Sequence, residues 1–192
     1  FILVSSVGAL GPPPPGQLLR EDSAPGERTD YGRSKWEGEQ RALAYKEQLQ
    51  LIILRPTAIY GPRDREMLPL FKMASSGWLP AFAGPEQVYN LAHVDDIVQG
   101  VVAATTAEVP SGAIYTLGCD EEATARELAQ LLGRLLGSKT RLLPLPRALL
   151  WVAALVSETW ARLARQPAML NRQKIPELTG SWRLDLSRAR EE

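Results

Sequence analysis

Tyr31 and Lys35 are the residues of this chain whose spacing best suits acid–base chemistry. They are four positions apart in a predicted helix, so their side chains lie on one face of it, one turn from each other. A phenol ionises only near about pH 10 and is a poor proton carrier at neutral pH, but a fixed ammonium group beside it favours the phenolate. Such a pair can pass a proton to or from an alcohol or a carbonyl group. Taken alone, the same spacing also fits two solvent-facing side chains.

Ser6 is the third candidate, because it directly follows an apolar run at residues 1–4 that reads as a buried strand. In a parallel sheet, the carboxyl ends of the strands border the ligand crevice. A hydroxyl group at that position can donate a hydrogen bond to a substrate oxygen.

The elements that must position these three residues alternate between strand and helix. Glycine and proline allow only a loop from residue 5 to about residue 29, and Asp30 is the expected N-cap of a helix over residues 31–48. A second continuously apolar run follows at residues 51–54. The order strand, helix, strand with fully apolar strands is typical of a parallel sheet that is covered on both faces.

The rest of the chain continues the α/β pattern. We expect helices over residues 65–76, 124–136 and 146–164, and a helix capped by Asp95 and Asp96 that runs to about residue 107. Strands are expected over residues 88–94, 113–117 and 141–145.

Composition excludes several classes of protein. Of 192 residues, 45% are hydrophobic, and 22 basic side chains balance 22 acidic ones, so no net field gathers nucleic acid. The apolar stretch at residues 148–157 is about half of the roughly 20 residues that a membrane crossing needs. One cysteine and one histidine cannot build a zinc site. We therefore expect a cytoplasmic protein without a metal, a nucleic-acid partner or a membrane span.

Five motifs, read in order, resemble the extended short-chain dehydrogenase/reductases, which are the NAD-dependent epimerase/dehydratase family. These motifs are Ser5-Ser6, Tyr31-Gly32-Arg33-Ser34-Lys35, Arg55-Pro56-Thr57-Ala58-Ile59-Tyr60-Gly61-Pro62-Arg63-Asp64, His93-Val94-Asp95-Asp96 and Trp182-Arg183-Leu184-Asp185-Leu186-Ser187-Arg188-Ala189-Arg190.

The resemblance implies the carboxyl-terminal part of a Rossmann-like parallel sheet with helices on both faces and a small, mostly helical substrate cap. Residues 1–192 would form one partial catalytic domain. Its core would comprise residues 1–64 and 88–107, its cap largely residues 65–87 and 108–181, and its truncated terminal helix residues 182–192. The Gly-rich phosphate-binding turn of this family is absent, so we expect Phe1 to lie roughly at the fifth strand and the chain by itself to be inactive.

The resemblance also implies roles for individual residues. Ser6 would orient the substrate oxygen, Tyr31 would be the acid–base group, and Lys35 would favour the ionised phenol and hold the nicotinamide ribose. The cofactor would be NAD or NADP, held by Tyr31, Lys35, Pro56, Thr57, Ala58 and Ile59. His93, Asp95 and Asp96 would instead form a structural hinge.

The partner would be a small-molecule substrate, and we allow for a homodimer. Enzymes of this family that act on sugar nucleotides usually carry Asn in the turn where this chain has Ala58, and the expected cap segments are apolar. A hydrophobic secondary alcohol or ketone is therefore the expected substrate, unless the aromatic residues only fill the core of the cap. The candidate substrate contacts are Val7, Arg63, Met67, Trp78 and Phe82.

Two alternative functions stay open. One is a sugar-nucleotide epimerase or dehydratase, although Val7 and Gly8 replace the Asp-Glu pair that such dehydratases usually carry. The other is a dinucleotide-sensing or scaffold protein that has lost turnover, although such proteins commonly lose the Tyr or the Lys that this chain retains.

Overall fold

The computed structural model describes residues 1–26, 28–82, 84, 86–164, 166 and 170–192. They form two compact units. Unit 1 comprises residues 1–64, 89–122 and 182–192, and unit 2 comprises residues 65–88 and 123–181.

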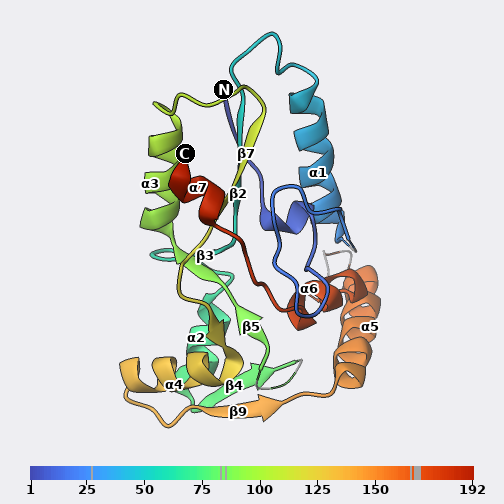
Figure 1. The fold of residues 1–192 in the computed structure, drawn as a ribbon. Helices are drawn as coiled ribbons and strands as arrows, with labels where there is room; N and C mark the ends of the chain where they lie inside the picture. Colours follow the sequence, from blue (N-terminus) through green and yellow to red (C-terminus); the bar gives the residue numbers. More distant parts are fainter. Residues whose placement is uncertain (27, 83, 85, 165, 167–169) are drawn as a thin grey trace. The chain divides into compact units, whose positions relative to one another are not determined.

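Unit 1 is built on a parallel sheet with the strand order β1 (Ile2–Val4), β2 (Ile52–Pro56), β7 (Ala113–Leu117). Leu3 pairs with Ile53, which in turn pairs with Ile114. A second parallel pair joins β3 (Ala58–Tyr60) to β6 (Leu91–His93). Figure 1 shows the helices α1 (Asp30–Leu43) and α3 (Val94–Ala104) on opposite sides of the three-stranded sheet. These features confirm the predicted α/β class.

The two faces of β2 bury different kinds of side chain. Ile52 and Leu54 pack in a cluster with residues of β7, α3 and the short helix α7 (Ser187–Glu191). Successive side chains of a strand point to opposite faces. Ile53 and Arg55 therefore point to the other face, and both are at most 1% exposed. The continuous apolar run thus marks a strand that is covered on both sides.

Several predicted boundaries of unit 1 shift. Thr29, not Asp30, is the N-cap of α1, because its hydroxyl group accepts the Gly32 amide at 3.1 Å. His93 caps α3 through its ring nitrogen, so Asp95 and Asp96 lie inside the first turn and are not its cap. The predicted loop contains a short 3-10 helix, η1 (Val7–Ala9).

Two segments differ from the predicted division into core and cap. Residues 108–122 were expected in the cap, but they belong to unit 1 because β7 hydrogen-bonds to β2 in the sheet. Residues 182–192 were expected to be a helix, but only α7 is helical. Leu184 instead forms a parallel bridge with Leu19 and packs with Val7 and Leu10.

Unit 2 combines helices with short strands. Its pieces are α2 (Leu68–Ser75), β4 (Trp78–Ala81), α4 (Ala125–Leu135), β9 (Arg141–Pro144), α5 (Arg147–Ala164), η2 (Arg172–Lys174) and α6 (Ile175–Thr179). β4 pairs in parallel with β9, and the two-residue strands β5 (Val88–Tyr89) and β8 (Ala123–Thr124) also pair. The helices α2, α4 and α5 and the strand β9 lie where they were predicted, whereas β4, β8, η2 and α6 were not predicted. Leu150, Ala154 and Ile175 form a buried cluster between α5 and α6.

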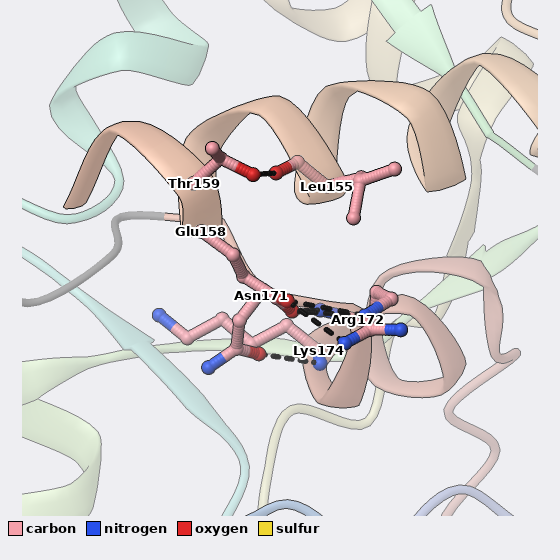
Figure 2. A network of polar contacts seen from close by, with 6 residues as sticks. All are labelled: Leu155, Glu158, Thr159, Asn171, Arg172 and Lys174. Carbon is pink, nitrogen blue, oxygen red and sulfur yellow. Dashed lines mark hydrogen bonds and ion pairs between the residues drawn. The ribbon is translucent and has the colours of Figure 1, made fainter. Parts of the chain in front are cut away.

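A polar network joins α5 to the segment that follows it (Figure 2). The Glu158 carboxylate accepts hydrogen bonds from the Arg172 amide at 2.9 Å and from the Arg172 Nε at 3.1 Å. The Asn171 side chain caps η2 by accepting the Lys174 amide at 3.0 Å. The hydrogen bonds from Arg172 lower the pKa of Glu158 below its usual value, chiefly through the Arg172 amide.

Candidate active site

Ser6 lies at the carboxyl end of β1, where the chain leaves the sheet. Its backbone is extended, with φ −163° and ψ 151°, and its Oγ accepts the Gly8 amide at 3.1 Å. This bond caps η1 and fixes the direction of the hydroxyl oxygen. Ser6 is half-buried, so its hydroxyl group lies at the border between the strand and the surface.

Tyr31 and Lys35 lie one turn apart on α1, as predicted. The Tyr31 side chain is 56% exposed, and the Lys35 Nζ lies 5.7 Å from the centroid of its ring. The same Nζ donates a hydrogen bond to the Val4 carbonyl at 3.3 Å. Lys35 therefore connects the helix to the end of the strand that precedes Ser6.

Gly8 brings Ser6 and Tyr31 to the same place. A Cβ atom built on Gly8 would lie 3.3 Å from the Ser6 Oγ and 3.7 Å from a Tyr31 ring carbon. The Ser6 hydroxyl group and the Tyr31 ring thus both border the Gly8 backbone. The structure brings Ser6, Tyr31 and Lys35 together at the carboxyl end of β1, although they come from two elements that are separated by a long loop.

The site requires a glycine at position 32, and the sequence analysis did not predict this. A Cβ atom on Gly32 would lie only 2.2 Å from the Gly8 carbonyl oxygen, so any side chain there would push α1 away from η1. The Tyr-Gly pair at the start of the helix was the available signal. A close approach of backbone to backbone is a common reason for glycine.

Residues 56–59, predicted as a turn, are extended in the structure, because Pro56 is the last residue of β2 and Ala58 and Ile59 begin β3. Pro56 and Thr57 are buried, whereas Ala58 and Ile59 are exposed. The Thr57 amide donates to the Leu117 carbonyl and its hydroxyl group donates to the Asn90 carbonyl, both at 2.8 Å. The hydrogen bonds of the buried Thr57 therefore fix the position of Ala58 and Ile59, which follow it and are exposed.

Asn90 holds this segment to the end of β7, and the sequence analysis missed it. Its side chain accepts the Cys119 amide at 2.9 Å and donates to the Cys119 carbonyl at 2.7 Å, while only 2% of Asn90 is exposed. A Cβ atom on Gly118 would lie 2.7 Å from the Asn90 Oδ1, so this clamp also needs a glycine.

The five candidate substrate contacts do not share one environment. Val7 is 6% exposed and packs in the core with Leu10 and Leu19, so its side chain serves packing. The exposed Arg63 has a left-handed backbone with φ 72°, which is rare for a residue other than glycine. In unit 2, Phe82 packs against the cluster of Leu150, Ala154 and Ile175.

The two remaining candidates also lie in unit 2. Met67 is half-buried and precedes α2, and Trp78 begins β4 with 45% of its surface exposed. Trp78 is thus an aromatic side chain of unit 2 that remains accessible, whereas Phe82 contributes to the core.

Two other tyrosines are unsuited to proton transfer near neutral pH. Burial raises the pKa of Tyr89 to about 12. The pKa of Tyr115 is also raised to about 12, by burial first and then by the Glu192 carboxylate that its hydroxyl group contacts at 2.5 Å.

The chain matches the profile of the NAD dependent epimerase/dehydratase family over residues 1–118. That match covers more than half of the chain. The chain belongs to this family.

Relatives of known sequence extend the likeness beyond residue 118. The chain is 31% identical over 186 residues to the ceramide reductase of Caulobacter vibrioides, covering 93% of this chain and 51% of that protein. The chain thus spans about half the length of this curated relative.

Solved structures share the fold. The structure of gox2253 has a TM-score of 0.72 and 26% identity, and the match covers 100% of this chain and 59% of that one. The UDP-glucuronic acid 4-epimerase of Bacillus cereus, solved with UDP-glucuronic acid and NAD, has a TM-score of 0.70 and 22% identity, covering 100% and 54%. At that identity, the second match shows the fold alone.

The cofactor of the family is a nicotinamide dinucleotide. Its description names NAD, and solved neighbours hold NAD or NADPH. The residues present are compatible with the nicotinamide end of such a cofactor, because the exposed Ala58 and Ile59 closely follow the carboxyl end of β2 and the Lys35 ammonium group contacts the carbonyl of Val4, the last residue of β1. Among the described residues, no helix is both long and apolar enough to cross a membrane.

Proposed function

We propose that this protein catalyses reversible hydride transfer between a secondary alcohol and a nicotinamide dinucleotide, with Ser6, Tyr31 and Lys35 as its catalytic residues. The observation that carries the proposal is that the Ser6 and Tyr31 side chains both border the Gly8 backbone, while the Lys35 Nζ lies 5.7 Å from the Tyr31 ring centroid. The membership of the chain in a family of NAD-dependent enzymes supports it.

The proton is handled by Tyr31. In the oxidation direction, the phenolate takes the proton of the substrate hydroxyl group, and in the reduction direction the phenol returns it to the developing alkoxide. Lys35 places its positive charge beside the phenol, with its Nζ 5.7 Å from the ring centroid. Ser6 donates a hydrogen bond to the same substrate oxygen, and its Oγ is already oriented by the Gly8 amide at 3.1 Å.

The cofactor would be held by Lys35, which reaches the ribose, and by the segment Pro56, Thr57, Ala58 and Ile59. The chemistry that a nicotinamide ring supplies when bound is hydride exchange with the substrate carbon. Thr57 and Pro56 are buried, so this segment would contact the cofactor through main-chain groups and the exposed Ala58 and Ile59.

The substrate would be hydrophobic. Ala58 offers no amide for a sugar hydroxyl group. The likeness to a ceramide reductase supports a substrate with long apolar groups. Arg63, which lies in unit 1 with the catalytic residues, remains a proposed contact.

A sugar-nucleotide epimerase is the second candidate function. The description of the family names epimerases and dehydratases, and a UDP-glucuronic acid 4-epimerase shares the fold. Both functions begin with the same oxidation step, so the residue roles above would apply to either.

A substrate panel separates the two. The protein made from its complete gene should be assayed by nicotinamide absorbance with ceramide, steroid alcohols and their ketones, and with UDP- and dTDP-hexoses. We expect a higher kcat/KM for the apolar alcohols or ketones, because Ala58 replaces the amide that would hydrogen-bond a sugar hydroxyl group. A UDP-hexose that is better by about tenfold would contradict the substrate class, and no turnover of any compound would contradict the enzymatic function.

A further inference from the structure

Behind the candidate active site lies a group of buried charged and polar side chains that the proposed chemistry does not use. Glu39 on α1 is 0% exposed, Arg55 on β2 is 1% exposed and Ser5 at the end of β1 is 5% exposed. The Arg55 guanidinium group donates twice to the Glu39 carboxylate, at 2.7 Å and 3.0 Å. The Ser5 hydroxyl group donates to the same carboxylate at 2.5 Å.

The group joins the three elements that carry the site. Tyr31, Lys35 and Glu39 are spaced four residues apart, so they follow one another along one side of α1. Ser5 immediately precedes Ser6, and the backbone there is extended, so the two side chains point to opposite sides of the chain. Ser5 thus directs its hydroxyl group to Glu39, while Ser6 directs its own toward Gly8.

Further bonds restrict Arg55. Its third nitrogen donates to the Glu21 carbonyl at 2.8 Å, and the Glu21 carboxylate accepts the Thr116 amide at 2.8 Å. The guanidinium group also lies 5.9 Å from the Trp36 ring centroid. Arg55 is therefore held by the helix, the loop and, through Glu21, by β7.

Stability alone is a weak reason for such an arrangement. Taking two charges out of water costs about as much as their attraction returns, and apolar residues of the same volume often serve a fold equally well. In this protein the pair would instead select a single geometry, because any other rotamer of Arg55 or Glu39 leaves a buried charge unpaired.

We infer that Ser5, Glu39 and Arg55 form a positioning triad that holds Ser6 in register with Tyr31 and Lys35; this rests on the proposed function. The hydrogen bond from Ser5 to Glu39 fixes the backbone before and after Ser5. It fixes Ser6, which follows Ser5, and the Val4 carbonyl, which precedes Ser5 and accepts the Lys35 ammonium group. Loss of the triad would leave all three catalytic side chains present but misplaced.

The test uses the protein made from its complete gene and the panel substrate that the wild type turns over fastest. Ser5→Ala should lower kcat about tenfold while KM and the NADH dissociation constant stay within about twofold, since a misplacement of about 1 Å can cost as much as a hundredfold. Glu39→Gln should lower kcat at least as much. The double variant should be close to the lower single variant, because residues that act as one unit are not additive.

Ser111→Ala is the matched control. Its hydroxyl group is also part of a hydrogen-bonded turn, donating to the carbonyls of Lys46 and Leu49 at 2.7 and 2.8 Å, but it precedes β7 and thus lies at the opposite end of the parallel sheet. It should lower the thermal midpoint without changing kcat. If Ser5→Ala behaves like this control, the triad is only structural and the inference is overturned.

A second measurement, which needs no turnover, tests the positioning triad independently of the proposed function. Hydrogen–deuterium exchange of residues 5–9 should be faster in Ser5→Ala than in the wild type, and unchanged exchange overturns the triad. A wild type without turnover overturns the proposed function, and the exchange measurement then decides the triad alone. If Glu39→Gln fails to fold, Ser5→Ala, which keeps the ion pair intact, carries the test.

Discussion

Gly32 and Gly8 pack backbone against backbone, so closely that a Cβ atom on Gly32 would lie 2.2 Å from the Gly8 carbonyl oxygen. Gly32 follows Tyr31 on α1, and Gly8 gives the amide that orients Ser6. The contact thus sets the distance between the two halves of the candidate site. Space for a side chain at Gly32 exists only if the helix moves.

The first prediction follows from this contact. Gly32→Ala should lower the free energy of unfolding by about 3 kcal/mol, because the methyl group meets backbone that cannot rotate away. Gly38→Ala on the same helix is the control. A Cβ atom there meets nothing within 4 Å, so this change should stabilise the protein by about 0.5–1 kcal/mol. Urea titrations of both variants measure the difference, and equal stabilities would contradict the close contact.

The second prediction concerns the acid–base pair. Tyr31→Phe should lower kcat by about 10²–10⁴-fold and leave cofactor affinity largely intact, because only the ionisable hydroxyl group is lost. Tyr45→Phe, at an equally exposed tyrosine beyond the end of α1, should leave kcat unchanged. Retention of more than about a third of wild-type kcat in Tyr31→Phe would exclude Tyr31 as the acid–base group.

Lys35→Ala should behave differently from Tyr31→Phe. The ammonium group is proposed to serve both the phenol and the ribose, so the variant should bind NADH or NADPH more weakly and also turn over more slowly. Fluorescence titration measures the affinity. Equal dissociation constants in wild type and variant would contradict the proposal that Lys35 binds the ribose.

A fourth prediction tests the Asn90 clamp beside residues 56–59. Asn90→Ala should cost about 1–3 kcal/mol of unfolding free energy, because the Cys119 amide and carbonyl lose their partner in a buried place. It should also weaken cofactor binding, since Thr57 rests on the Asn90 backbone. Asn171→Ala removes an exposed-side cap in unit 2 and should leave cofactor affinity as it is. An unaltered cofactor affinity in Asn90→Ala would show that the Asn90 hydrogen bonds do not contribute to cofactor binding.

The fifth prediction is a pH dependence. The pKa of Glu158 is lowered in the folded protein, mainly by the Arg172 amide and then by the Arg172 side chain. Its contribution is therefore fully present above the unfolded value of about 4.5 and is lost as pH falls through the lower folded pKa. Glu158→Gln should flatten the fall of stability below about pH 4.5. Thermal melts of the wild type and the variant between pH 3 and 6 measure this, and parallel curves would contradict the prediction.

The sequence predicted the strands and helices well where hydrophobic periodicity was continuous, as in β2 and α4. It placed caps less well. Asp30 and Thr29 are both good capping residues and differ by one position, and a histidine cap such as His93 carries little signal. The apolar pattern of β7 predicts a strand but does not say which sheet it joins, so its place beside β2 was missed.

The candidate site divides in the same way. Tyr31 and Lys35 could be found from local spacing, because two residues that are four positions apart in a helix lie on the same face of it. Asn90 and the pair of Glu39 and Arg55 could not, because their partners lie 29 and 16 residues away and only the folded sheet brings them together.

The four-residue spacing of Tyr31, Lys35 and Glu39 on α1 limits insertions and deletions in this helix. An α-helix turns by about 100° per residue, so one residue inserted or deleted between Lys35 and Glu39 would rotate the carboxylate by that angle away from Arg55 and Ser5. Substitutions on the outer side of the helix, at Arg33 or Glu37, leave that geometry untouched. The number of residues between the proposed catalytic pair and the buried carboxylate is therefore constrained more tightly than the identity of the exposed residues on the outer side of the helix.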